Sequence, residues 1–203
     1  MALRLVDGMV LEGDPNYCLS MYTHYLLPKI DTHVITNPLR DGGYYVLMPI
    51  ASGIMELDEK RDTVKIDKLL TTSDSAFSKV DVMNMTSAKK EEGDIDGPFS
   101  LGVAITDSAD QVETKIVWFT SSSLLEPSID EMVSGGNFDL FLNSLNWMCE
   151  REEKISIHPK TIKNEILMVP AAAATRWSIL LVGILPAIFL IAGISVWVRR
   201  RRR

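Results

Sequence analysis

The pattern of apolar and polar positions changes sharply near residue 177. Residues 177–198 read WSILLVGILPAIFLIAGISVWV, a run of 22 residues without a charge. At a rise of about 1.5 Å per residue, a helix of this length spans about 33 Å, enough to cross a hydrocarbon core of about 30 Å. A buried core helix is the alternative, but core helices rarely stay uncharged for so long. The pattern therefore predicts a transmembrane helix over 177–198.

Single residues within this run are those expected of a membrane anchor. Trp177 and Trp197 lie at its two ends, where the headgroup region favours amphipathic rings. Pro186 interrupts the run, which a membrane helix tolerates where a neighbour or a local adjustment satisfies the freed carbonyl. Gly193 is small enough to allow another helix to approach closely.

A block of arginines predicts the orientation of this helix. The run is followed directly by Arg199, Arg200, Arg201, Arg202 and Arg203. Basic residues next to a membrane segment stay on the cytoplasmic side, and only Arg176 lies close to the other flank. We therefore expect a single-pass plasma-membrane protein with a domain outside the cytoplasm over 1–169, a linker over 170–176, a span over 177–198 and a cytoplasmic tail over 199–203.

The region before the linker has the pattern of a mixed α/β domain. Residues 99–106 and 113–120 are strand-like and joined by a short polar connection, which predicts an antiparallel hairpin. Residues 44–49 are nearly all apolar, as in a strand covered on both faces, and residues 63–67 alternate as in a half-buried strand. Residues 33–39 are expected to be extended and to end in a proline turn.

One helix is predicted from Asn137, as its N-cap, to about Arg151. Apolar residues at helical spacing form a stripe that is expected to face the core: Phe138, Phe141, Leu142, Leu145 and Met148. Polar residues at i+4 and i+7 are expected to form a solvated face: Asp139, Asn143 and Asn146. Residues 83–97, which are polar and charged, are expected to be a solvated loop.

Charge and cysteine content exclude some classes of function. Five of the 21 basic residues are in the tail, so residues 1–198 hold 16 basic and 27 acidic residues, a net charge of −11. Such an acidic domain is a poor nucleic-acid binder, because it cannot supply many phosphate contacts. The two cysteines, Cys18 and Cys149, imply no disulfide framework and are expected to be ordinary buried thiols, although sequence does not decide whether they pair.

Candidate catalytic residues lie at the end of the 113–120 strand. Ser121, Ser122 and Ser123 follow it, where open α/β sheets bind ligands. A nucleophile elbow needs flanking glycines and a tight turn from strand to helix, and a long loop follows here instead, so catalysis is disfavoured.

Other chemistry-bearing residues give weaker signals. His24, His33 and His158 have no partner at ligand spacing, so neither a metal site nor a cofactor is predicted. Gly135-Gly136-Asn137 could begin an anion-binding helix or form a tight turn with a cap.

The amino terminus is in conflict with an exported domain. Residues 1–14 contain Asp7 and Glu12 and do not read as a signal peptide. The expectation is either a C-terminal piece of a longer protein or a tail-anchored protein with its domain in the cytosol.

Several stretches, taken in order, resemble one family. They are MVLEGDP at 9–15, HVITNPL at 33–39, LLTTS at 69–73, GPFSLGVA at 97–104, GNFDLFLNSLNW at 136–147, and the closing LP at 185–186 with GISVWVRRR at 193–201. This set resembles the C-terminal half of the GldG-type auxiliary proteins of ABC transporters. Where family members carry a Gly-Asp-Ser-like turn, this chain has Thr120 followed by the three serines.

The resemblance implies a fold and a set of partners. It implies an extracytoplasmic domain of the class I glutamine amidotransferase-like (Rossmann-like) fold, working in the membrane bilayer beside an ABC permease and its ATPase, without enzymatic activity or cofactor. A separate chain could supply the N-terminal half of the domain. The expected function is that of a non-enzymatic accessory subunit that docks to the permease or to the substrate of an export or gliding-type system.

Two alternatives remain open. One is a membrane-anchored hydrolase or amidotransferase relative that uses Ser121 to Ser123 or Cys18 with a histidine such as His33. The other is a tail-anchored cytosolic interaction protein, which the missing export signal favours and the arginine block disfavours.

Overall fold

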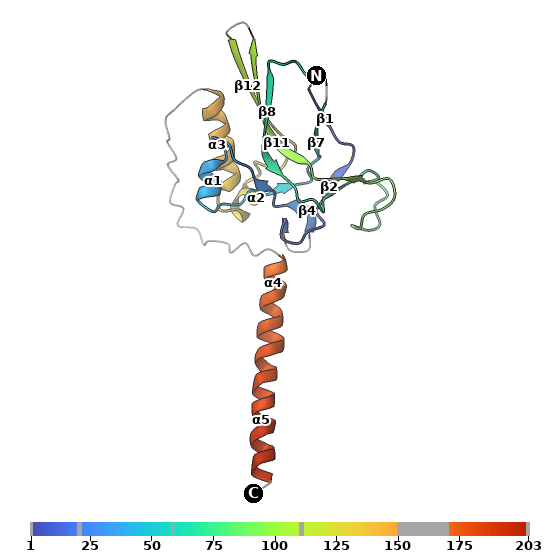
Figure 1. The fold of residues 1–203 in the computed structure, drawn as a ribbon, viewed down its shortest axis with the longest axis vertical. Coiled ribbons are helices and arrows are strands. Elements are labelled where there is room, and N and C mark those ends of the chain that lie inside the picture. The colour runs from blue at the N-terminus through green and yellow to red at the C-terminus, as the bar shows by residue number, and fades with distance from the viewer. Residues whose placement is uncertain (1, 20–21, 58, 110–111, 150–170, 202–203) are drawn as a thin grey trace.

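A computed structural model describes residues 2–19, 22–57, 59–109, 112–149 and 171–201 (Figure 1). The strands are β1 (Leu3–Leu5), β2 (Met9–Leu11), β3 (Cys18–Leu19), β4 (Tyr22–Leu26), β5 (Lys29–Ile30), β6 (Met48–Pro49), β7 (Ile54–Glu56), β8 (Val64–Thr71), β9 (Phe77–Lys79), β10 (Ile95–Asp96), β11 (Ser100–Ala109) and β12 (Val112–Phe119). The helices are α1 (Asn37–Asp41), α2 (Pro127–Met132), α3 (Gly136–Met148), α4 (Ala171–Ser178), the π-helical turn η1 (Ile179–Ile184) and α5 (Leu185–Arg201). The chain is therefore of the mixed α/β class that its sequence predicts.

The strands form three sheets. The largest has the order β1-β7-β11-β8-β5, with β12 paired to β11, and the two smaller sheets have the orders β10-β9-β2 and β3-β4-β6. Every strand pair in the described ranges is antiparallel. A parallel, Rossmann-like sheet is not among these pairs.

The predicted hairpin is confirmed and organises the large sheet. β11 and β12 pair without a bulge from Gly102↔Phe119 to Ala109↔Val112. The predicted 63–67 strand is also present and continues as β8 to Thr71, on the other side of β11.

Alternation along these strands gives the large sheet two apolar faces. Ala104 and Val117 belong to the main core, which also contains Leu140 of α3. Val103, one residue along β11, instead packs with Leu3 and Ile54 in a separate, smaller cluster. Figure 1 shows α1 and α3 together on one side of β8, β11 and β12.

The prediction of an extended piece over 33–39 is wrong. Residues 33–36 form a bend and a turn. Residues from Asn37 form α1, with Pro38 in the first turn. Proline fits there because the first N–H groups of a helix have no intrahelical partner and its fixed φ is already helical. Leu39 of α1 is buried in the main core.

The predicted 44–49 strand is buried only over residues 46–49, since Tyr45 is 46% exposed, and only Met48 and Pro49 pair with a neighbouring strand. At Leu47 the backbone groups bond to the side chain of Asn137 instead of to a neighbouring strand. Its Oδ1 accepts the Leu47 N–H at 2.9 Å, and its Nδ2 donates to the Leu47 carbonyl at 2.9 Å and to the Leu124 carbonyl at 2.9 Å. The backbone bonds of this segment are thus made to an amide side chain.

Asn137 can reach these groups because two glycines precede it. Gly135, rather than Asn137, is the N-cap of α3, and its φ of 90° suits a residue without a Cβ. A Cβ on Gly136 would lie 2.2 Å from the Tyr45 carbonyl oxygen. The helix start is therefore pressed against the 44–49 segment.

α3 is rotated relative to the predicted orientation. Its buried residues are Gly136, Asn137, Leu140 and Ser144. Three residues of the predicted core stripe are exposed, and we call them the α3 stripe: Phe138 at 42%, Leu142 at 51% and Leu145 at 37%. The prediction that these residues face the core is wrong, because the buried amide of Asn137 determines which face packs inward.

The face of α3 that the sequence predicts to be solvated is partly buried. Asn143 is half-buried and donates from Nδ2 to the Ile35 carbonyl at 3.1 Å. Cys149, expected in the core, is exposed.

A buried lysine holds the 83–97 loop. The Lys79 side chain is 2% exposed, and its Nζ lies 2.8 Å from Glu91, 3.3 Å from Asp94 and 3.1 Å from the Lys89 carbonyl. The hydrogen bond to Glu91 is the main reason that the pKa of Lys79 is raised. Burial opposes ionisation of Asp94, but the N–H groups of Glu91 and Val80 together with Lys79 outweigh it and lower the pKa of Asp94.

Replacing Asn137 by alanine should lower the free energy of unfolding by about 3 kcal/mol, because it leaves the Leu47 N–H and two carbonyls unsatisfied in the core. Urea unfolding of the full chain in detergent, followed by tryptophan fluorescence, measures this. Asn143→Ala removes one half-buried bond and should cost about 1 kcal/mol. Equal losses in the two variants would contradict the central role of Asn137.

Acid should weaken the fold through Asp94. Its pKa is lower in the folded chain, so its ionised form stabilises the fold above the usual aspartate pKa, and this contribution is lost as pH falls. Thermal unfolding between about pH 7 and pH 3 should therefore show a steeper decline in Tm for the wild type than for Asp94→Asn. Glu92→Gln, in the exposed part of the same loop, is the control and should keep the wild-type slope.

Candidate functional site: the membrane anchor

One helix in the described ranges is long and apolar enough to cross a membrane. It comprises α4, η1 and α5, and its candidate span is Thr175–Arg201, 27 residues. At about 1.5 Å per residue this is about 40 Å, more than the hydrocarbon thickness. The predicted 177–198 run lies within it, and residues 171–176 of the predicted linker are helical as well.

The helix accommodates Pro186 by a local change in its hydrogen bonding. Proline has no N–H, so it cannot bond the carbonyl one turn earlier. The turn just before it, Ile179–Ile184, is π-helical, and the Leu185 N–H donates to the Leu180 carbonyl five residues back. Such single π turns are the known way of absorbing an interruption inside an α-helix.

The apolar surface of this helix is open along its length. Ile188, Phe189 and Leu190 are among its exposed apolar residues. A Cβ built on Gly193 would meet no described atom within 4 Å. Water is a poor solvent for a surface of this size, so the helix requires lipid or another apolar partner.

The ends of the helix carry the predicted interfacial residues. Trp177 and Trp197 are both exposed, and the Arg201 guanidinium lies 5.3 Å from the centre of the Trp197 ring, within cation–π range. Arg199, Arg200 and Arg201 form the last helical turn, where positive charge suits the helix dipole. Arg202 and Arg203 lie outside the described residues.

Ser121 to Ser123, which we call the serine loop, make hydrogen bonds that hold the loop in place. Ser121 is buried, and its hydroxyl donates to the Pro49 carbonyl. Ser123 donates to Glu126 at 3.1 Å just before α2, which lies inside the predicted long loop, and Ser122 is exposed. The Ser121 hydroxyl thus ties this loop to β6, and its proton is directed at a backbone carbonyl rather than at a base.

Cys18 and His33 are in environments that do not favour nucleophilic catalysis. Burial, with Glu12 and Asp14 adding to it, raises the pKa of the Cys18 thiol. Thiolates are the nucleophilic form, so a raised pKa makes the thiol less reactive. Burial is also the main cause that lowers the pKa of His33.

His33 has a packing role in this structure. Its Nδ1 accepts the Ile35 N–H at 3.2 Å, and its ring meets Trp147 edge-on, with the ring centres 5.4 Å apart. His24 contacts the rings of Tyr22 and Tyr25, and His158 lies outside the described residues. In the part of the chain that the structure describes, no cluster of three or more His, Cys, Asp or Glu residues could hold a metal ion.

The candidate anion site at Gly135-Gly136-Asn137 is occupied by the protein itself. The Asp130 carboxylate of α2 accepts the Phe138 N–H at 3.0 Å.

The surface that sequence reasoning missed is the α3 stripe. The residues were recognised as an apolar stripe, but no local signal shows which face of α3 turns outward.

A charge in the middle of the helix should prevent stable insertion. Ile188→Arg should shift the insertion free energy by about 3 kcal/mol towards the uninserted form. Carbonate extraction of membranes from expressing cells should then release much of the variant and little of the wild type. Ile188→Ala is the matched control and should stay with the membrane, whereas retention of both variants would contradict insertion of this helix.

Comparison with known protein families, curated proteins and solved structures finds no match to this chain.

Proposed function

We propose that the chain is a membrane-anchored, non-enzymatic accessory subunit of an ABC-type transport system. The observation that carries this proposal is the exposed apolar helix Thr175–Arg201, which ends on a block of arginines. Its mechanism would be docking: the helix packs against permease helices while the folded domain contacts the permease or its substrate. ATP hydrolysis would belong to another chain.

The resemblance to GldG-type auxiliary proteins supports this system rather than another. The resembling stretches include 97–104, which enters β11, and 136–147, which is nearly the whole of α3. The free side of β12 offers an edge to which a strand of a partner can add, because β12 pairs only with β11 among the described strands.

The α3 stripe is a candidate contact for the permease. Phe138, Leu142 and Leu145 present one apolar face at helical spacing, which is a common mode of recognition between helices. Residues 150–170 connect α3 to the membrane helix, and 21 residues reach at most about 75 Å. The length of this segment therefore sets an upper limit of about 75 Å on the distance between the end of α3 and the start of the helix.

The proposed orientation places the arginine block in the cytoplasm and the domain outside. Glu92→Cys, in a background with Cys18 and Cys149 changed to serine, puts one thiol in an exposed loop. A membrane-impermeant thiol reagent should label this variant in intact cells. Labelling only after permeabilisation would place the domain in the cytosol and support the tail-anchored alternative.

A thiol placed on the other side of the membrane controls for differences in reactivity between the two cysteine positions. Arg203→Cys in the same background keeps four of the five arginines and should be labelled only after permeabilisation. The cysteine-free background measures non-specific labelling. If both thiols label in intact cells, the helix does not span the membrane in the proposed way.

A further inference from the structure

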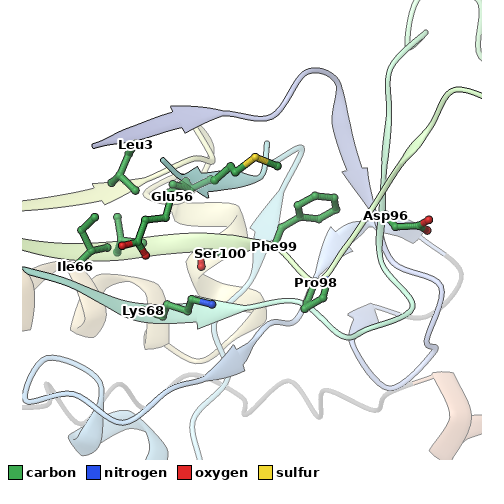
Figure 2. A pocket seen from close by; sticks show the side chains of 11 residues that line it. Leu3, Glu56, Ile66, Lys68, Asp96, Pro98, Phe99 and Ser100 are labelled. Carbon is green, nitrogen blue, oxygen red and sulfur yellow. The ribbon is translucent and has the colours of Figure 1, made fainter. Parts of the chain in front are cut away.

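The face of the large sheet opposite α3 contains a pocket of about 200 Å³. Strands β1, β7, β8, β10 and β11 contribute residues to it, several of which Figure 2 labels. We call it the sheet pocket. It is separate from the membrane helix, the serine loop and the α3 stripe, and the proposed function does not use it.

One part of the sheet pocket is lined by apolar side chains. Leu3, Ile54 and Val103 line it and are at most 5% exposed, and Ile66 packs beside them. These are the residues of the smaller apolar cluster, over which no described helix lies. Because these side chains are already almost fully buried, a hydrocarbon or aromatic group placed there would remove mainly its own apolar surface from water.

One hydroxyl that lines the sheet pocket has no partner among the described residues. Ser100 is 8% exposed and lines the pocket, and its hydroxyl makes no hydrogen bond to another described residue. Its oxygen is not among the fully buried polar atoms, so water reaches it in the pocket and a ligand can replace that water. The Ser100 hydroxyl is therefore available to a bound molecule.

The charges around the pocket favour an anion with one negative charge. Glu56 is paired with Lys60, and Asp96 lies 2.6 Å from Lys90. Lys68, an exposed residue of β8, also lines the pocket, and its ammonium has no carboxylate partner among the described residues. One uncompensated positive charge attracts an anion, while the two nearby carboxylates would repel a second negative charge.

We propose that the sheet pocket binds a small, largely apolar molecule that carries one carboxylate. The carboxylate accepts hydrogen bonds from Lys68 and Ser100, and the apolar body lies on Leu3, Ile54 and Val103. A cavity of about 150 Å³ already holds benzene, so this pocket suits an aromatic or branched acid of about ten non-hydrogen atoms. At the affinity per atom usual for such ligands, a Kd of about 1 mM is expected.

The test uses 4-fluorobenzoate as the probe, with the full chain in detergent. Fluorine NMR should show saturable binding, and 4-fluorobenzamide, which has the same shape without the charge, should bind about tenfold more weakly. Empty detergent micelles give the background for both compounds. No saturable binding of the acid, or equal binding of the amide, would overturn the proposal.

Variants locate the site. Lys68→Met should weaken binding about tenfold, and Ser100→Ala about fivefold, because each removes one hydrogen bond to the carboxylate. Lys65→Met is the matched control: it lies on the same strand, pairs with Asp67 at 2.8 Å and does not line the pocket, so it should bind like the wild type. Circular dichroism checks that each variant is folded. Unchanged binding in Lys68→Met, or an equal loss in Lys65→Met, would place the ligand elsewhere.

Discussion

The buried amide of Asn137 is the interaction on which the folded domain depends most. One side chain satisfies the N–H and carbonyl of Leu47 and the carbonyl of Leu124, and so joins three segments that no sheet connects at this point. Its position requires Gly135 in a left-handed conformation and Gly136 in contact with the Tyr45 carbonyl. An apolar residue could fill the space but could not make these bonds, and unpaired backbone groups in a core are costly.

The same amide explains why the domain has an exposed apolar helix face. Because Asn137 points inward, Leu140 and Ser144 follow it on the buried side, and Phe138, Leu142 and Leu145 turn outward. The Ser144 hydroxyl then donates to the Leu140 carbonyl within the helix at 2.7 Å. On its other side the large sheet has an apolar face without a described helix, which holds the sheet pocket. Both surfaces suit a domain that works against a partner or a ligand.

The helix Thr175–Arg201 depends on different interactions. Its apolar surface is exposed along the helix, and just before Pro186 a π turn adjusts the backbone hydrogen bonding. The tryptophans and arginines at its ends are consistent with a location at the two membrane interfaces.

Sequence alone determined the features that depend on local composition. The apolar run needs only length and the absence of charge, and the β11–β12 hairpin needs only neighbouring residues, so both were predicted. Tertiary structure decided the orientation of α3, the pairing of residues 44–49 and the meeting of Ser100 with Lys68 in one pocket. Asn137 bonds Leu47 across 90 residues of chain, and a local pattern cannot show that a polar residue will be preferred inside over the phenylalanine beside it. The physical reason is that burial of a polar group is decided by partners that only the fold brings within reach.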